Sequence, residues 1–546
     1  MNFKDKVIYQ IYPKSFQDTT GNGFGDLKGV TSRLNYLEEL GVDYVWLTPF
    51  FISPQRDNGY DVADYRNIEP LFGTMADCEE LIEEANKRGI GIMLDMVFNH
   101  TSTEHEWFKK ALAGDPEYMD YYIFKDGMPD QPPTNWESKF GGNAWEYVPH
   151  LKKWYLHLFD VTQADLNWEN PKVREELKEI IRFWKNKGVK GFRFDVVNLI
   201  SKPEVFENDT IGDGRRFYTD GPSVHAYLKE LVADTQIEDM VTVGEMSSTT
   251  LEHCIRYSNP KEKELSMCFN FHHLKVDYKD GNKWELMPPD FNALKELFYN
   301  WQLGMQENEG WNALFWCNHD QPRVVSRLGD DENYWKESSK MLATCIHMMQ
   351  GTPYIFQGEE IGMTNAKYTD ISQYRDVESK NYYEIMLKKG KTKEETLAIL
   401  GARSRDNGRT PMQWNSSNNA GFSNGTPWLS IPENYKDINV ETEQSDADSI
   451  LAYYKKLIQI RKQYRAISEG KIEFIYEIHP EVLAYKRVCG DEEFLVLNNL
   501  GRNHIELATD LQLESYEKVL GNYEEAEDAK GLEAFEAIVY RRIKID

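Results

Sequence analysis

Eight short apolar runs recur along the chain, beginning at Val7, Tyr44, Gly91, Gly191, Met240, Leu265, Asn312 and Thr352. In each run both faces of a strand would be largely apolar, as in a parallel sheet that is covered by helices. Helical patterns lie between the runs, and several end in glycine just before the next run, at Gly41, Gly89 and Gly188. Eight strands that alternate with helices predict an α/β fold, a (β/α)₈ TIM barrel.

Two stretches interrupt this alternation. From about Thr101 to Asn170 the chain is polar and aromatic, and it is too long for an ordinary connection after the third strand. We therefore expect an inserted subdomain beside the active face of the barrel. From about Lys471 the runs alternate between apolar and polar residues, which indicates an antiparallel β-domain. The predicted domains are the barrel over residues 1–100 and 171–467, the inserted subdomain over 101–170 and a C-terminal β-sandwich domain over 468–546.

The composition excludes some partners. The chain has 546 residues and a formal net charge of −27, which argues against non-specific binding to nucleic acid or to an anionic membrane. No apolar stretch approaches membrane-spanning length, and no signal peptide is visible. The six cysteines are scattered without metal-binding spacing, so we expect free thiols and a cytoplasmic protein.

Charged residues stand at the ends of several predicted strands, among them Asp195, Glu245 and Asp320. Any one of them could be part of a buried structural ion pair, but a ring of them at successive strand ends favours an active site. Glycoside hydrolysis needs one ionised and one protonated carboxyl group. Arg193 would share a strand face with Asp195 and could keep it ionised as a nucleophile. Burial would favour a protonated Glu245 as general acid, and Asp320 with His319 could stabilise the transition state.

The motifs DMVFNH, GFRFDVVN, VGEM and NHD occur in this order, and QADLNWEN lies in the inserted stretch. In these motifs the chain resembles the α-amylase superfamily (glycoside hydrolase family 13) over nearly its whole length. The resemblance implies a retaining mechanism with Asp195 as nucleophile, Glu245 as acid/base and Asp320 as stabiliser of the transition state. It also implies a glucose-binding pocket, formed by Asp57, Tyr60, His100, Phe159, Gln163, Arg193, His319 and Arg405.

Three features narrow the implied substrate. The DNGYD motif and Arg405 are typical of exo-acting α-glucosidases. A valine directly after the nucleophile, Val196 in this chain, resembles the residue found in enzymes that act on α-1,6 or related non-1,4 linkages. RRFYTDGP, VGEMSSTTLEHCIRY and FNFHHLKVDY resemble trehalose-6-phosphate hydrolases, whereas oligo-1,6-glucosidases usually depart at HHLK and SSTT. This implies a glycoside hydrolase with α,α-phosphotrehalase activity, which releases glucose and glucose 6-phosphate. An oligo-1,6-glucosidase that acts on isomaltose-type oligosaccharides is the alternative.

A basic segment follows the sixth predicted strand, with His272, His273, Lys275 and Lys283. A phosphate in the leaving-group subsite would need such a cationic patch, so these four residues are the candidates for binding it. The alternative is that this segment is an ordinary solvated surface loop that binds no phosphate. If the Asp-Gly pair between the lysines formed a strict two-residue hairpin, Lys275 and Lys283 would face opposite sides, whereas a wider loop would remove the conflict.

A glycine-rich loop after the first strand places oxygen-bearing groups at alternate positions, namely Asp18, Thr20, Asn22, the Phe24 carbonyl and Asp26. Such spacing suits Ca²⁺, although a simple glycine-rich turn explains it equally well. The family resemblance favours a structural Ca²⁺ or Mg²⁺. We expect no organic cofactor, a phosphorylated disaccharide as the small-molecule partner, and a monomer or small homo-oligomer. A non-enzymatic relative would usually lack one of the three carboxylates, and transglycosylation as a side activity stays open.

Overall fold

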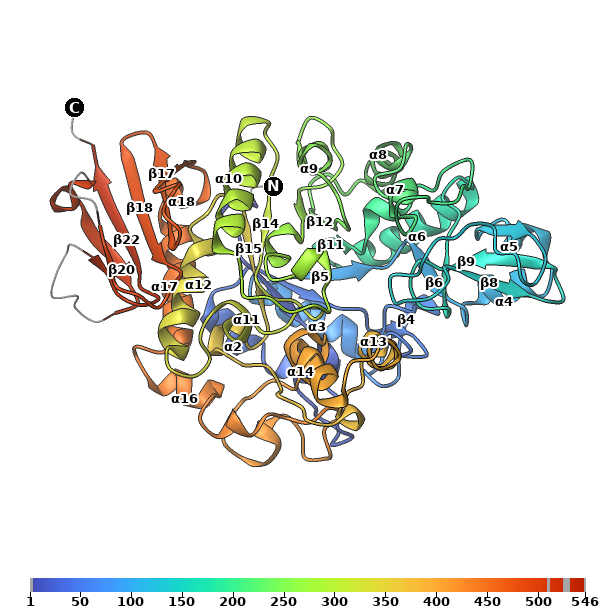
Figure 1. Ribbon diagram of the computed structural model, residues 1–546, viewed down its shortest axis with the longest axis horizontal. Coiled ribbons are helices and arrows are strands. Elements are labelled where there is room, and N and C mark those ends of the chain that lie inside the picture. Colours follow the sequence, from blue (N-terminus) through green and yellow to red (C-terminus); the bar gives the residue numbers. More distant parts are fainter. Residues whose placement is uncertain (1–2, 508–510, 524–530, 545–546) are drawn as a thin grey trace.

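The computed structural model describes residues 3–507, 511–523 and 531–544 (Figure 1). Its centre is an eight-stranded sheet in which all neighbouring strands are parallel. A parallel bridge between Cys268 and Asn312 joins the two outer strands and closes the barrel. The predicted (β/α)₈ barrel is confirmed, with the strands β1 (Ile8–Ile11), β2 (Tyr44–Leu47), β5 (Gly91–Met96), β11 (Gly191–Phe194), β12 (Val241–Glu245), β13 (Met267–Phe269), β14 (Ala313–Leu314) and β15 (Thr352–Phe356).

Helices surround these strands (Figure 1). Gly41 follows the second helix with a φ of 93°, and Gly188 follows the sixth with a φ of 95°, a backbone region that favours glycine. The helices of this part are α1 (Leu27–Ser32), α2 (Leu34–Leu40), α3 (Met75–Lys87), α6 (Pro171–Asn186), α7 (Arg215–Tyr218), α8 (Val224–Thr235), α9 (Leu251–Ser258), α10 (Phe291–Glu307), α11 (Val324–Leu328), α12 (Trp335–His347), α13 (Val377–Lys388), α14 (Lys393–Arg403), α15 (Asp406–Arg409), α16 (Val440–Ser445), α17 (Ile450–Gln463) and α18 (Arg465–Ser468).

Two antiparallel ribbons shape the carboxyl end of the barrel. Strands β3 (Phe51–Ile52) and β4 (Asp64–Ile68) pair with each other, and the loop between them carries the DNGYD motif. Strands β6 (His100–Ser102) and β10 (Gln163–Asp165) pair so that Asp165 lies opposite His100. The second ribbon joins the start of the insertion to its end, and it brings residues from both ends to the same edge of the barrel.

The rest of the insertion lies at one end of the molecule (Figure 1). It contains a three-stranded antiparallel sheet in the order β7–β9–β8. Its side chains pack in a separate apolar cluster that includes Trp136 and Trp145 together with Leu199 and Tyr218 from the segment after β11. This packing fixes the insertion against that segment. The elements are α4 (Glu106–Leu112), α5 (Pro116–Met119), β7 (Phe124–Asp126), β8 (Trp145–Val148) and β9 (Lys153–Leu156).

The C-terminal antiparallel β-domain is also confirmed, and it lies at the opposite end of the molecule (Figure 1). The buried guanidinium of Arg487 donates hydrogen bonds to the carbonyls of Met348 and Gly470, which ties this domain to the barrel. Residues 508–510, 524–530 and 545–546 of the predicted domain lie outside the described residues. A five-stranded sheet has the order β16–β17–β18–β22–β20 and a two-stranded sheet pairs β19 with β21, with β16 (Lys471–Ile475), β17 (Val482–Cys489), β18 (Glu492–Asn499), β19 (Ile505–Glu506), β20 (Glu517–Gly521), β21 (Gly531–Leu532) and β22 (Ala537–Ile543).

All six cysteines are free thiols, as predicted, and five of them are buried. Within the described residues, none of the helices combines the length and the apolar character that crossing a bilayer requires.

Candidate active site

Two of the candidate catalytic carboxyl groups meet on a single guanidinium. The strand register places Arg193 of β11 beside Asp95 of β5, while Glu245 ends the neighbouring strand β12. Arg193 Nη1 donates to Asp95 Oδ1 at 2.7 Å and to Asp195 Oδ1 at 2.6 Å. Its Nη2 donates to Glu245 Oε2 at 2.5 Å. Adjacent parallel strands thus bring Asp195 and Glu245 together at the carboxyl end of the barrel.

This arrangement changes the protonation expected for Asp195. Burial raises the pKa of Asp195 well above its usual range; Arg193 opposes the shift, and the charges of Glu245 and Asp95 add to it. Three carboxyl groups share the one guanidinium, so Arg193 offsets the burial of Asp195 only in part. Asp195 and Glu245 bind the same guanidinium, which places the candidate nucleophile and the candidate acid/base side by side.

Asp320 has the opposite electrostatic environment. Its Oδ2 lies 3.3 Å from His319 Nε2, and its Oδ1 lies 3.3 Å from Arg405 Nη1 and 2.8 Å from Arg409 Nη2. Burial alone would raise the pKa of this carboxyl group, but the charges of His319 and the two arginines outweigh it and hold the pKa well below its usual range. Asp320 is therefore ionised at neutral pH and can stabilise positive charge.

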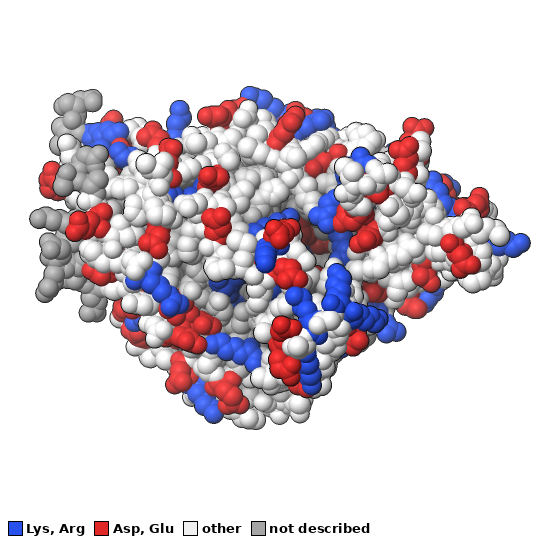
Figure 2. Space-filling model, in the orientation of Figure 1, with Lys and Arg blue, Asp and Glu red and all other residues white. Residues whose placement is uncertain are grey.

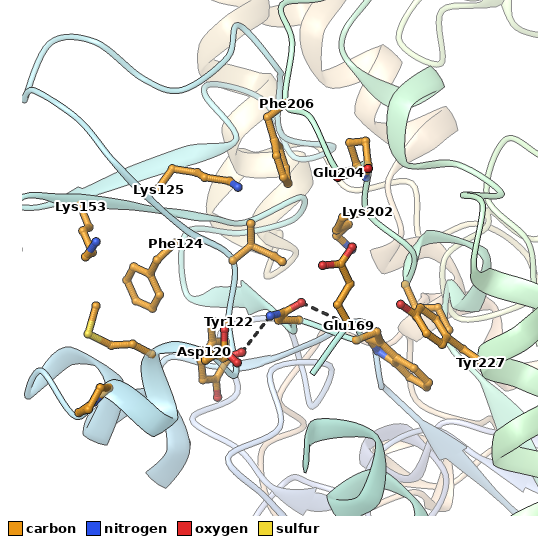
Figure 3. A pocket seen from close by; sticks show the side chains of 17 residues that line it. Asp120, Tyr122, Phe124, Lys125, Lys153, Glu169, Lys202, Glu204, Phe206 and Tyr227 are labelled. Atoms are coloured by element: carbon orange, nitrogen blue, oxygen red, sulfur yellow. Dashed lines mark hydrogen bonds between the residues drawn. The ribbon is translucent and has the colours of Figure 1, made fainter. Parts of the chain in front are cut away.

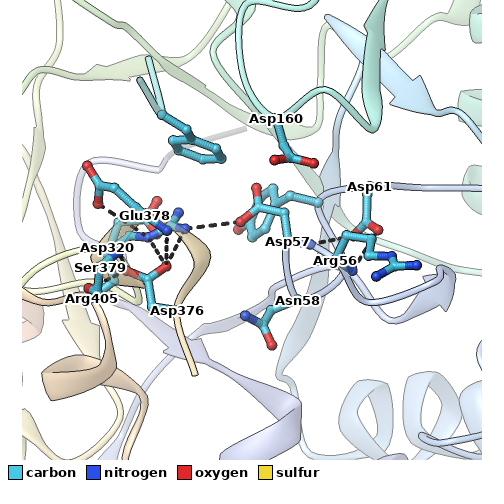
Figure 4. Close-up of polar contacts among 12 residues, drawn as sticks. Arg56, Asp57, Asn58, Asp61, Asp160, Asp320, Asp376, Glu378, Ser379 and Arg405 are labelled. Carbon is cyan, nitrogen blue, oxygen red and sulfur yellow. Dashed lines mark hydrogen bonds and ion pairs between the residues drawn. The ribbon is translucent and has the colours of Figure 1, made fainter. Parts of the chain in front are cut away.

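Arg405 joins acidic side chains from three separate segments, the loops of Asp57 and Asp320 and the start of helix α13 (Figure 4). Its Nη2 lies 3.1 Å from Asp57 Oδ1 and 2.6 Å from Asp376 Oδ1, and its Nε lies 3.6 Å from Glu378 Oε2. Burial raises the pKa of Asp57 to about 7, although Arg405 lowers it. The sequence analysis missed Asp376 and Glu378, because neither belongs to a motif that points to a sugar.

The other predicted pocket residues pack around this charged core. The Tyr60 hydroxyl donates to Asp95 Oδ2 at 2.9 Å, and its ring stacks on His319 with centroids 5.0 Å apart. Gln163 Nε2 donates to Asp57 Oδ2 at 3.0 Å. A cavity of about 240 Å³ lies above them, and its walls include Asp57, Tyr60, His100, Phe159, Asp195, Glu245, Asp320 and Arg405. Sequence reasoning missed Phe140, Tyr278 and Gln321, which also line it.

The two lysines predicted to bind phosphate line this same cavity. The loop between them is wider than a two-residue hairpin, because Tyr278 forms an antiparallel bridge with Leu286 and a short helical turn lies between. The conflict in their orientation therefore does not arise. Lys275 is exposed, whereas Lys283 Nζ donates to Glu378 Oε2 at 2.6 Å.

The two histidines of this segment contact backbone carbonyls. His272 Nε2 lies 2.9 Å from the Thr249 carbonyl, and His273 Nε2 lies 2.8 Å from the Phe315 carbonyl. Burial lowers the pKa of each histidine to about 4, so both are neutral near pH 7. They hold the basic segment against the barrel, and they add no positive charge for a phosphate.

The glycine-rich loop after β1 is organised by its own carboxylates. Asp18 Oδ1 accepts hydrogen bonds from the backbone N–H groups of Thr20 and Gly21, at 2.8 and 2.9 Å. Asp18 Oδ2 accepts one from Gly23 at 2.8 Å, and Asp26 caps helix α1. These contacts hold the loop in one conformation.

The loop also offers donors of the right kind for a hard cation. All candidate ligands are oxygen atoms, which suits Ca²⁺, and the side chains of Thr20 and Asn22 are exposed. Among the described residues, no group of three or more His, Cys, Asp or Glu side chains is placed to hold a metal ion. An ion in this loop would therefore depend on neutral oxygens as well as on Asp18 and Asp26.

A buried lysine, Lys202, stabilises residues next to the pocket. Lys202 Nζ lies 2.8 Å from Asp165 Oδ2 and donates to Asn99 Oδ1 at 2.8 Å. Asn99 Nδ2 in turn donates to Asp165 Oδ2 and lies 3.2 Å from His100 Nδ1. Lys202 also lines a separate cavity of about 400 Å³ between the insertion and the segment after β11 (Figure 3). Nothing in the sequence around Lys202 indicated this role.

We expect Lys202→Met to destabilise the protein by about 3–5 kcal/mol, because it leaves the Asp165 carboxylate buried without its cation. Denaturant unfolding near pH 7 measures this loss. The matched control is Lys125→Met, since Lys125 lines the same cavity without an ion pair in the described part of the chain. Equal stability of the two variants would contradict a structural role for the Lys202 ion pair.

An eight-stranded parallel barrel with paired carboxyl groups at the ends of neighbouring strands defines a class of barrel glycosidases. The family model described as alpha amylase, catalytic domain, matches residues 10–470. The chain therefore belongs to the α-amylase family, glycoside hydrolase family 13.

Several relatives cover the chain almost completely. A trehalose-6-phosphate hydrolase of Bacillus subtilis (strain 168) is 54% identical over 99% of this chain and 98% of its own length. An oligo-1,6-glucosidase of Parageobacillus thermoglucosidasius is 46% identical over 99% of this chain and 98% of its own. A crystal structure of the Bacillus licheniformis trehalose-6-phosphate hydrolase has a TM-score of 0.94 and 54% identity, covering 99% of this chain and 100% of that one.

Proposed function

We propose that this protein is a retaining α-glucosidase that hydrolyses α,α-trehalose 6-phosphate to glucose and glucose 6-phosphate. The observation that carries this choice of substrate is the pair of lysines, Lys275 and Lys283, on the wall of the cavity that also contains Asp195 and Glu245. A neutral disaccharide needs no cation there, whereas a phosphate does. The higher identity to trehalose-6-phosphate hydrolases than to oligo-1,6-glucosidases supports the same choice.

The proposed reaction proceeds in two displacements. Asp195 attacks the anomeric carbon of the non-phosphorylated glucose, while Glu245 donates its proton to the glycosidic oxygen and glucose 6-phosphate leaves. Asp320 stabilises the oxocarbenium-like charge as the bond breaks. A water molecule then attacks the glucosyl–Asp195 ester, with Glu245 taking the proton, and glucose is released with retained configuration.

The test is glucose release from trehalose 6-phosphate, trehalose and isomaltose at equal concentrations. We expect kcat/KM for trehalose 6-phosphate to exceed that for trehalose by about 100-fold or more, because a lost charge-assisted contact costs about 1.5–3 kcal/mol and a phosphate makes more than one. Preference for isomaltose would overturn the choice of substrate and favour an oligo-1,6-glucosidase with the same catalytic residues.

We also propose that the enzyme acts in the cytoplasm, as a monomer or small homo-oligomer without nucleic-acid or membrane partners. Free thiols and a phosphorylated substrate support this location. The net charge of −27 disfavours the other partners.

We propose in addition that Ca²⁺ binds the loop of Asp18, Thr20, Asn22, Phe24 and Asp26 and stabilises the fold, without a part in the chemistry. Removing divalent ions with EDTA is then expected to lower the melting temperature by a few degrees, and excess CaCl₂ should restore it. Asp26 also caps α1, so Asn22→Ala is the cleaner variant, and it should abolish the response to Ca²⁺. An unchanged melting temperature of the wild type in EDTA and in CaCl₂ would contradict a bound ion.

A further inference from the structure

A third lysine, Lys139 of the inserted segment, reaches the wall of the active-site cavity. Its backbone N–H donates to the Leu158 carbonyl at 2.9 Å, which anchors the residue beside Phe140 of the cavity wall. Its Nζ donates to Ser247 Oγ at 3.2 Å. Ser247 lines the cavity and stands two residues after Glu245, so the ammonium lies next to the strand that carries the candidate acid/base.

Arg215 approaches the same place from the segment after β11. It begins helix α7, and its Nε donates to both oxygens of Asp213 at 2.9 Å. The Glu137 N–H donates to the Asp213 carbonyl at 3.0 Å, which fastens this segment to the insertion two residues before Lys139. Lys139 Nζ lies 5.7 Å from the centre of the Tyr218 ring in the same short helix.

Three positively charged side chains therefore lie near one another, those of Lys139, Arg215 and Lys275. Burial lowers the pKa of Lys139 to about 8; the charges of Arg215 and Lys275 also lower it, whereas those of Asp213 and Asp165 raise it. Although Lys275 is exposed overall, desolvation of its ammonium on the cavity wall and the charge of Arg215 lower its pKa. Among the described residues, neither lysine has a carboxylate within ion-pair distance.

Arg215 is paired with Asp213, whereas the two lysines have no such partner among the described residues. Neighbouring cations disfavour one another, and functional sites are where such arrangements occur. The protein as a whole carries a charge of −27, so this local group of cations does not follow from its overall composition. Figure 2 shows acidic and basic side chains together around a hollow near the middle of the visible face. Lys283 lies on the wall of the same cavity and, like Arg215, is paired with an acidic side chain, Glu378.

We propose that Lys139 and Arg215, together with Lys275, bind the phosphate of the leaving glucose 6-phosphate, and that Lys139 and Arg215 are specificity-determining residues. This rests on the proposed function. A phosphate monoester carries a charge of about −1.5 to −2 near pH 7 and offers three acceptor oxygens, which matches three converging cations. The two residues come from the insertion and from the segment after β11, so the site forms only where these meet the basic segment after β13.

The test compares Lys139→Met and Arg215→Met with Lys279→Met. Lys279 is an exposed lysine of the same basic segment, and unlike Lys139 it makes no contact with Ser247 of the cavity wall. We measure the ratio of kcat/KM for trehalose 6-phosphate to kcat/KM for p-nitrophenyl α-glucoside. This ratio is expected to fall by about 10- to 100-fold in the first two variants, mainly through KM, and to stay within about 2-fold in the control. Lys139→Arg should recover part of the loss.

A pH series gives an independent readout. In the wild type, KM for trehalose 6-phosphate is expected to rise as the pH passes through about 8, because Lys139 loses its proton while the phosphate keeps its charge. Lys139→Met should lack this rise. If the wild type prefers trehalose 6-phosphate over trehalose but the ratio is unchanged in both variants, the assignment of Lys139 and Arg215 is wrong and the function stands. If the wild type shows no such preference, the proposed function itself fails.

Discussion

Asp195→Asn is expected to reduce kcat for trehalose 6-phosphate and for p-nitrophenyl α-glucoside alike, by at least about 10³-fold. An amide cannot form the glucosyl ester, so both substrates lose the same step. The side chain keeps its shape, and Arg193 keeps its contacts with Asp95 and Glu245, so the fold should persist. Steady-state kinetics and a circular dichroism spectrum measure the two effects. Ordinary turnover by this variant would place the nucleophile elsewhere.

Glu245→Gln is the matched control, because it removes the proton donor and leaves the nucleophile in place. Turnover of trehalose 6-phosphate should fall by about 10²- to 10⁴-fold. An aryl glucoside has a leaving group that departs without protonation, so its first step should suffer much less. Equal losses of kcat/KM, which reports the first step, on both substrates would contradict the assignment of Glu245 as the general acid.

The barrel and its catalytic centre were predictable because both follow from local pattern and strand register. Parallel strands that are covered on both faces leave continuous apolar runs, and their carboxyl ends meet at one edge of the sheet. Asp195 and Glu245 therefore had to be neighbours once β11 and β12 were recognised. The raised pKa of Asp195 could not be predicted, because it depends on burial and on Asp95, which lies about a hundred residues earlier and shares Arg193 with it.

The residues that sequence reasoning missed come from loops, whose relative positions no spacing reveals. Lys139 and Ser247 are 108 residues apart in the chain, yet their side chains are in contact. Burial also changes what a basic residue can do. His272 and His273 counted as cations in the sequence, but in the structure they are neutral anchors, and Lys283 is paired with Glu378. A local count of basic residues therefore locates the segment beside the cavity but does not give its net charge.

The largest expected effect on both stability and activity comes from Arg405→Met. Arg405 is buried and holds Asp57, Asp376 and Asp320 together (Figure 4). Without it, acidic side chains remain buried around a cavity that must also bind glucose. We expect the free energy of unfolding to fall by about 3–5 kcal/mol and glucosidase activity to be lost. Arg56→Met is the control, because Arg56 is an exposed arginine that directly precedes Asp57 in the same loop.

The loss of stability caused by Arg405→Met should depend on pH, and the pKa shifts of Asp376 and Asp57 set the direction of this dependence. In the wild type the charges of Arg405 and Arg409 outweigh burial and lower the pKa of Asp376, so its stabilising effect is present above the unfolded value and disappears in acid. In the variant, burial raises the pKa of Asp376 instead, and that of Asp57 rises beyond about 7. Ionising these groups then opposes folding. The stability difference between variant and wild type should therefore be larger near pH 8 than near pH 5, as measured by urea unfolding, and adding Asp376→Asn should recover part of it. A difference that is independent of pH, or that grows in acid, would mean that Arg405 supports the pocket through packing and not through its charge.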